Sequence, residues 1–227
     1  MEIRVVKDRI RIDGTQSGMP GAMIFDNTKS TEFQINSKAG TYIEMSPSEM
    51  ERLLEETLKR SLPNPTPDEQ KRLDEMLSAR RTAASAPIPT QEFFPFSTDK
   101  VGAWPCRNYA PSGGAVVCAA DVALFGLSAS DLEPFRQFAQ FENSLSPSPS
   151  GMPPSSSTEF FVAGVSEGKP LAALVLRRTR EFTPGNRAVF EVTEVRRETF
   201  AADLFEVPSG LRKETIPAPV VPIPRAR

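Results

Sequence analysis

Apolar and polar residues alternate along residues 1–45, as they do in strands of a sheet that has one face in water. The alternation is clearest over residues 9–13, 31–36 and 41–45, and turn-forming sequences separate these stretches. The region is therefore predicted to form an antiparallel meander. Four apolar side chains are expected on its inward face, namely Phe33, Ile35, Ile43 and Met45.

The spacing of the apolar residues becomes helical after residue 45. Ser46-Pro47-Ser48-Glu49 combines an N-cap residue, a proline at the first helical position and an early acid. Further helices are predicted over about 67–81 and after a cap at Ser128 or Ser130. The apolar stripes of the three helices are, in order, Met50, Leu53, Leu54 and Leu58, then Leu73, Met76 and Leu77, then Leu132, Phe135, Phe138 and Ala139.

Strand-like patterns return at residues 92–96, around the two cysteines, and in a last pair at 171–180 and 187–197. A symmetric loop between the last two strands would place Arg178 opposite Glu191, which is a favourable cross-strand pair. Strands therefore come in three groups, with helical segments between them.

This order predicts an α+β fold in which a curved antiparallel sheet, a half-barrel, holds two to three helices on its concave face. The chain is expected to form one domain over residues 1–213. A helical insert at about 47–81 and a Ser/Pro-rich loop at about 143–157 interrupt that domain. The Pro-rich tail, residues 214–227, is expected to be disordered.

The two cysteines lie on one predicted hairpin. A three-residue loop, Pro111-Ser112-Gly113, would place Cys106 directly opposite Cys118, whereas a two-residue loop would send the sulfurs to opposite faces. We predict a disulfide that acts as a structural staple, because the Cys-x-x-Cys spacing of redox pairs is absent. Since disulfides persist in oxidising compartments, a periplasmic or other extracytoplasmic location is expected. The alternative, a cytosolic protein with two reduced thiols, stays open.

The beginning of the chain is strand-like and charged, unlike a signal peptide, so an export signal is expected to be missing upstream of Met1. No apolar run approaches the roughly 20 residues of a membrane-spanning helix.

The composition excludes several chemistries. Histidine is absent, which removes Ser-His-Asp and Cys-His nucleophile systems and histidine-ligated metals. Two cysteines without histidine do not complete a structural zinc site. Acidic and basic residues nearly balance, 29 against 27, so no overall field points to nucleic acid. We therefore expect no catalytic residues, no metal and no cofactor.

Three stretches carry a family resemblance. They are Gly21-Ala-Met-Ile-Phe-Asp-Asn-Thr-Lys with Tyr42-Ile-Glu-Met, the segment from Val101 to Cys118, and Phe200-Ala-Ala-Asp-Leu-Phe-Glu-Val-Pro-Ser-Gly. The first two resemble a bacterial family of uncharacterised envelope proteins. The third resembles the closing motif of LolA-like lipoprotein carriers. The resemblance implies a LolA-like fold, which binds acyl chains between sheet and helices, and it implies no catalytic residues.

Two functions remain open. The first is a non-enzymatic envelope protein that binds a lipid or acyl chain between the sheet and the helices. The second is an interaction or structural module with a self-filled core, whose partner would be another envelope protein. Apolar residues at strand and helix periods are usually just buried, which favours the second. The candidate cavity residues are Phe33, Ile43, Met45, Met50, Leu53, Leu54, Leu58, Met76, Phe135 and Phe138.

Overall fold

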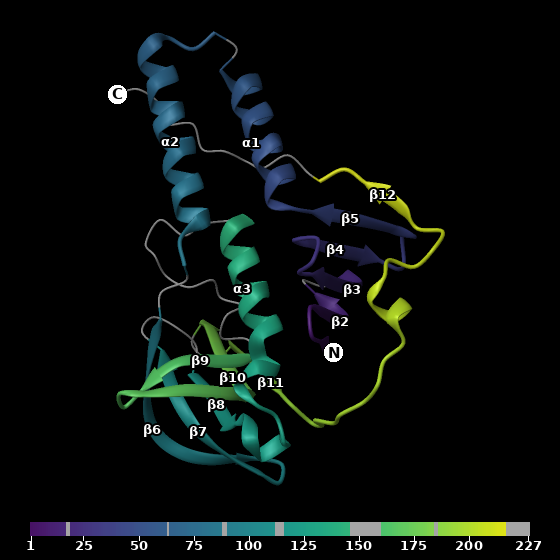
Figure 1. Ribbon diagram of the computed structural model, residues 1–227, viewed down its shortest axis with the longest axis vertical. Coiled ribbons are helices and arrows are strands. Elements are labelled where there is room, and N and C mark those ends of the chain that lie inside the picture. The colour runs from purple at the N-terminus through teal and green to yellow at the C-terminus, as the bar shows by residue number, and fades with distance from the viewer. Residues whose placement is uncertain are drawn as a thin grey trace. The chain divides into compact units, whose positions relative to one another are not determined.

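The computed structural model describes residues 1–16, 19–62, 64–87, 90–111, 116–145, 160–183 and 186–216. The chain divides into two compact units, one made of Met1–Ala86, Ser144–Pro147 and Ala201–Arg227, the other of Pro87–Asn143 and Ser148–Phe200. Each unit carries its own six-stranded sheet, and three α-helices accompany the sheets (Figure 1). The α+β class is thus confirmed. The prediction of one antiparallel sheet is wrong, because the strands form two mixed sheets. The grouping of residues 1–213 into one domain stays a prediction.

The first unit contains the predicted meander. Its sheet has the order β1-β2-β3-β4-β5-β12. The strands are β1 (Glu2–Val6), β2 (Arg9–Gln16), β3 (Met19–Asp26), β4 (Thr31–Asn36), β5 (Thr41–Met45) and β12 (Arg212–Glu214). The first five pair antiparallel in sequence order, and β12 joins the edge parallel to β5. Glu214 therefore belongs to a strand, so the predicted tail begins inside the sheet. Residues 217–227 of that tail lie outside the described residues.

The register of β4 against β5 corrects the predicted inward face. Phe33 lies opposite Glu44, so each odd-numbered residue of β4 faces an even-numbered residue of β5. This follows from the four residues between the strands, and it turns the odd-numbered residues of the two strands to opposite faces. The prediction that four apolar residues share one face is therefore wrong. Phe33 and Ile35 lie on one face of the sheet, and Ile43 and Met45 lie on the other.

The two faces of this sheet are covered differently. One face carries fully buried apolar residues, among them Ile10, Ile12, Met23 and Phe25. The opposite face carries Arg9 and Arg11 and is crossed by the segment that follows residue 200. A short 3-10 helix there, Ala202–Phe205, buries Phe205. Arg11 Nη1 donates to the Leu204 carbonyl oxygen at 2.7 Å, which ties the segment to the sheet.

Two helices, α1 (Pro47–Ser61) and α2 (Pro67–Ser85), form the predicted insert. The hydroxyl of Ser46 accepts the Glu49 amide, as expected for the N-cap of α1. Thr66 and Glu69 form a capping box at the start of α2. The helices differ in burial: α1 buries Leu53, Leu54 and Leu58, and α2 buries no residue.

The second unit holds the sheet with order β11-β10-β8-β7-β6-β9, in which β9 also pairs with β10. Its strands are β6 (Gln91–Val101), β7 (Trp104–Pro111), β8 (Val116–Asp121), β9 (Phe161–Ser166), β10 (Lys169–Thr183) and β11 (Asn186–Glu191). The β9–β10 pairing closes β6 to β10 into a small barrel. The helix α3 (Glu133–Leu145) lies between β8 and β9 in sequence, after a capping box of Ser128 and Asp131. Residues 143–145 are therefore helical, not part of the predicted loop, and 146–157 lie outside the described residues.

Two apolar clusters stabilise this barrel. The first draws a buried side chain from each of its five strands, including Phe93, Tyr109, Val117, Val162 and Val175, as expected for a barrel interior. The second surrounds the cysteines and is made of Val101, Cys106, Cys118, Ala120 and Leu176, with Trp104, Phe125, Leu174 and Val192 packed against it.

The cysteine pair is confirmed, but its register differs from the prediction. The two sulfur atoms lie 2.09 Å apart, which is disulfide distance. Asn108, rather than Cys106, lies opposite Cys118, so the disulfide joins a diagonal pair of positions on one face. Pro111, predicted to lie in the loop, belongs to β7, and residues 112–115 lie outside the described part of the chain.

The last hairpin is also displaced by one residue. Arg177 lies opposite Glu191, and Arg178 opposite Phe190. A bulge between Glu181 and Thr183 causes the shift, because an extra residue on one strand moves every later pair by one. The predicted pair of Arg178 with Glu191 is therefore wrong.

Candidate functional site

The ten predicted cavity residues are divided between the units. Phe135 and Phe138 are buried in the second unit, and the other eight belong to the first. In the first unit Leu53, Leu54 and Leu58 are buried, Phe33, Ile43, Met45 and Met50 are half-buried, and Met76 is exposed. Two pockets in the first unit contain one predicted residue each.

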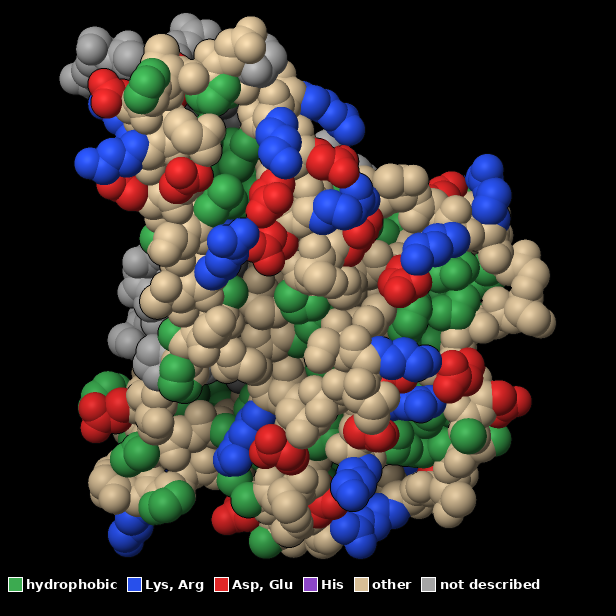
Figure 2. Space-filling view, turned by 45° about the horizontal axis from the view of Figure 1, so that its top comes forward, with side chains coloured by type: hydrophobic (Ala, Val, Ile, Leu, Met, Phe, Trp, Pro, Cys, Tyr) green, Lys and Arg blue, Asp and Glu red, His purple; other side chains and the backbone are tan. Residues whose placement is uncertain are grey.

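The larger pocket is a groove between α1 and α2, of about 490 Å³. We call it the helical groove. It is lined by the apolar residues Leu58, Leu62, Pro65, Leu73 and Leu77, and by the polar residues Glu55, Lys59, Gln70, Asp74 and Arg81. Figure 2 shows hydrophobic side chains along the helical groove, with acidic and basic side chains beside it.

Arg81 links the two helices at one end of this groove. Its Nη2 atom lies 3.1 Å from Glu55 Oε1, and its Nε atom donates to Glu51. The hydrogen bond to Glu51 raises the pKa of Arg81. These are the ion pairs that join α1 to α2 among the described residues. Away from Arg81, leucines of both helices line the helical groove.

Of the residues that line the groove, the sequence predicts only Leu58 as a cavity residue. Leu73 and Leu77 are predicted as part of the apolar stripe of α2, together with Met76, but not as cavity residues. In the structure Leu73 and Leu77 line the groove, whereas Met76 is 38 % exposed and does not. The short, Pro-containing connection was a usable signal, because helices joined by such a loop lie side by side and antiparallel.

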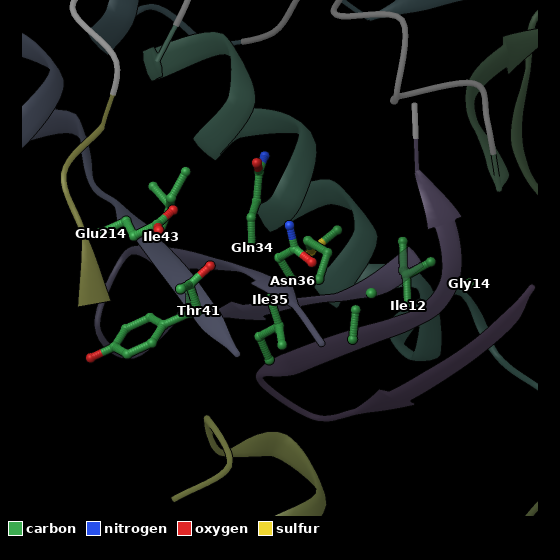
Figure 3. Close-up of a pocket in the computed structure, with 12 residues that line it drawn as sticks. Ile12, Gly14, Gln34, Ile35, Asn36, Thr41, Ile43 and Glu214 are labelled. Atoms are coloured by element: carbon green, nitrogen blue, oxygen red, sulfur yellow. The ribbon is translucent and has the colours of Figure 1, made fainter. Parts of the chain in front are cut away.

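The smaller pocket, of about 150 Å³, lies at one end of the first sheet. We call it the sheet-end pocket. Its lining includes apolar Ile12, Met23 and Ile43 and polar Gln34, Asn36, Thr41 and Glu214, from strands β2 to β5 and β12. Figure 3 shows Ile12, Gln34, Asn36 and Ile43 projecting from the same side of the sheet. No residue in the described part of the chain lines both pockets.

A buried carboxyl lies on that same face of the sheet. Glu32 is 5 % exposed, between Phe25 on β3 and Met45 on β5 in the register. Burial raises the pKa of Glu32, and the hydrogen bond from Gln34 Nε2 at 2.9 Å opposes that shift only in part. Gln34 therefore connects this buried acid to the sheet-end pocket.

The described residues contain no group of three or more Cys, Asp or Glu side chains placed to hold a metal ion. Within the same residues, no helix is both long and apolar enough to cross a membrane. Comparison of the chain with protein-family models, with known proteins and with solved structures yields no match.

Proposed function

We propose that this is a non-enzymatic extracytoplasmic protein that binds a lipid or acyl chain in the helical groove. The observation that carries the proposal is the groove itself, which is lined by four leucines and a proline. Its volume of about 490 Å³ lies within the range of small-molecule sites, ~300–1,000 Å³. Burial of acyl surface would supply the affinity, at about 25 cal/mol per Å².

The groove replaces the site expected between the sheet and the helices. On the buried face of the first sheet, Ile10, Ile12, Met23 and Phe25 are at most 2 % exposed, which leaves little of their surface for an acyl chain. The sheet-end pocket, at about 150 Å³, falls below the ~300–1,000 Å³ of sites for drug-sized ligands, so it is too small for a long acyl chain. The helical groove is therefore the better place for an acyl chain in this unit.

The size of the groove favours a small ligand over a protein. Ten of the described residues line it, whereas a stable protein–protein interface uses roughly 20–30 residues on each side. At its rim, Lys59 has no ion-pair partner among the described residues, so it is available to an anionic headgroup.

The extracytoplasmic location rests on the disulfide-distance cysteine pair. The LolA-like fold stays part of the proposal: the three helices and the curled second sheet support it only at the level of the α+β class.

Displacement of a fluorescent fatty acid by dodecanoate tests the proposal on the full chain. Leu73→Gln places an amide in the groove, and Met76→Gln makes the same kind of change on α2 outside it. We expect Leu73→Gln to weaken binding about tenfold or more, because desolvating an amide costs more than 1 kcal/mol, and Met76→Gln to leave it unchanged. Equal effects of the two variants, or no binding by the wild type, would overturn the proposal.

The second candidate, an interaction module without ligand, is favoured by a different observation. Phe94 and Phe96 on β6 are 55 % and 58 % exposed. Neighbouring exposed aromatic residues are typical of surfaces that contact a partner. If no acyl chain binds and Phe94→Ser with Phe96→Ser abolishes self-association in sedimentation velocity, the second candidate replaces the first. A wild-type chain that sediments as a monomer would remove that support.

A further inference from the structure

We infer that the sheet-end pocket is a binding site for a small organic primary ammonium ion, with its hydrocarbon part against Ile12, Met23 and Ile43. This site is separate from the helical groove and does not depend on the function proposed there. It is built by strands β2 to β5 and β12 of the first unit.

The first observation is a hydroxyl in the pocket wall that has no protein partner among the described residues. Thr41 is only 2 % exposed and lines the pocket, on the same face as Asn36, which lies opposite it. Within the described ranges, no side-chain hydrogen bond involves the Thr41 hydroxyl. The hydroxyl keeps access to solvent through the pocket, so it is free to bond a polar group of a ligand there.

The second observation is the orientation of the two amides. Gln34 uses its Nε2 atom as donor to Glu32, so its Oε1 atom is left as an acceptor. Asn36 uses its Oδ1 atom to accept the Ala39 amide at 3.0 Å, so its Nδ2 atom is left as a donor. Gln34 Oε1 and the Thr41 hydroxyl thus offer two acceptors to the pocket, beside the N–H donors of Asn36 Nδ2.

The third observation is the charge at the pocket. Among the described residues of its lining, Glu214 is the one ionisable acid or base apart from the Tyr42 phenol. It lies opposite Ile43 on β12, with Arg212 of the same strand 3.4 Å away and exposed to solvent. A primary ammonium carries three donors and a positive charge, and Gln34, Thr41 and Glu214 offer acceptors of which one is anionic.

The size of the pocket limits the hydrocarbon part. Its volume of about 150 Å³ corresponds to a cavity that holds a molecule the size of benzene, so chains of about four to six carbons fit. Ile12 and Met23, each 2 % exposed, form an apolar floor for such a group. The inferred ligand class is therefore a short alkyl or aryl amine.

The test is a ¹H–¹⁵N correlation NMR titration of the full chain with n-butylammonium. The neutral n-butanol and the anionic butyrate are the matched probes, because they share its hydrocarbon part. We expect millimolar n-butylammonium to shift the amides of Asn36, Thr41 and Ile43, with n-butanol at least about tenfold weaker. No shifts with n-butylammonium, or equal affinity for butyrate, would overturn the inference.

Three variants separate the site from general attraction of cations. Thr41→Val keeps the shape of the side chain and removes the hydroxyl, and Glu214→Gln removes the charge. Glu44→Gln is the control, because Glu44 lies on the opposite face of β5 and pairs with Lys213. We expect the first two variants to weaken binding about fivefold to tenfold and the control to leave it unchanged. An equal loss in the control and in Glu214→Gln would overturn the inference.

Discussion

Arg177 and Asp99 form an ion pair between the two strands that flank the disulfide-bonded hairpin. Asp99 on β6 lies opposite Cys106, and Arg177 on β10 lies opposite Cys118. The ion pair thus joins β6 to β10 beside the disulfide, which joins β7 to β8. The cysteines are 5 % and 1 % exposed. This level of the sheet is therefore cross-linked by side chains across four neighbouring strands.

The disulfide is expected to stabilise the second unit. Replacing both cysteines, Cys106→Ala with Cys118→Ala, should lower the free energy of unfolding by about 3 kcal/mol, because the unfolded chain gains the entropy of an open loop. Urea unfolding of the oxidised wild type and the double variant measures the difference. Reduced wild-type protein is the control and should unfold at nearly the same urea concentration as the variant. Equal stability of the oxidised wild type and the double variant would contradict the staple role.

Glu32 should make the protein less stable as the pH rises. Burial raises the pKa of Glu32 above its ordinary value of 4.5, so the unfolded chain releases this proton more readily than the folded one. Its contribution to stability is therefore complete below pH 4.5 and is lost as the pH rises through the folded-state pKa. Glu32→Gln should stabilise the protein at pH 7 by roughly 1–3 kcal/mol and remove this dependence. Parallel unfolding curves for variant and wild type between pH 4 and pH 8 would show that Glu32 is not responsible.

Asp26 should act in the opposite direction. Burial raises the pKa of this carboxyl, but hydrogen bonds from Thr28 and Lys29 and the charge of Arg9 outweigh burial and lower it below 3.8. Its stabilisation is therefore present above pH 3.8 and is lost as the pH falls through the folded-state pKa.

Asp26→Asn should accordingly destabilise the protein at pH 7 by about 1 kcal/mol, through weaker hydrogen bonds to a neutral acceptor. The difference should shrink as the pH falls below 3.8, because the unfolded wild-type chain then binds a proton that the folded chain takes up only at lower pH. Thermal unfolding at pH 7 and pH 3 measures both. A constant difference at the two pH values would contradict the account.

The sequence predicted local structure well and long-range pairing poorly. The cap at Ser46 and the apolar stripes of the two helices locate the insert. The parallel pairings of β5 with β12 and of β6 with β9 join segments far apart in sequence, and no local pattern encodes them. For that reason two sheets could not be distinguished from one.

Register errors had a common physical cause. Loop length and bulges decide which residues are opposite, and a shift of one residue changes the face of every side chain that follows. The four-residue connection before Thr41 separated Ile43 from Phe33, and the bulge at Glu181 displaced the partner of Glu191. The candidate cavity was therefore assembled from residues that the structure distributes over different faces and units.

Arg81 should hold the two helices of the groove together. Arg81→Met keeps the length of the aliphatic stem and removes both ion pairs to α1. Because α2 buries no residue of its own, its amides should exchange with deuterium several-fold faster in this variant, and the sheet should be unaffected. Arg60→Met is the control, since Arg60 pairs with Glu56 within α1. Equal exchange of α2 in both variants would contradict the clamp.

The measurement that tests the central claim most directly is native mass spectrometry of the full chain, exported to a bacterial periplasm and purified without detergent. We predict a bound molecule of several hundred daltons that is released on denaturation, fragments as a lipid, and is strongly reduced in Leu73→Gln but retained in Met76→Gln. A bare chain in the wild type, with the Cys106–Cys118 bond intact, would contradict the claim that the helical groove binds an acyl chain.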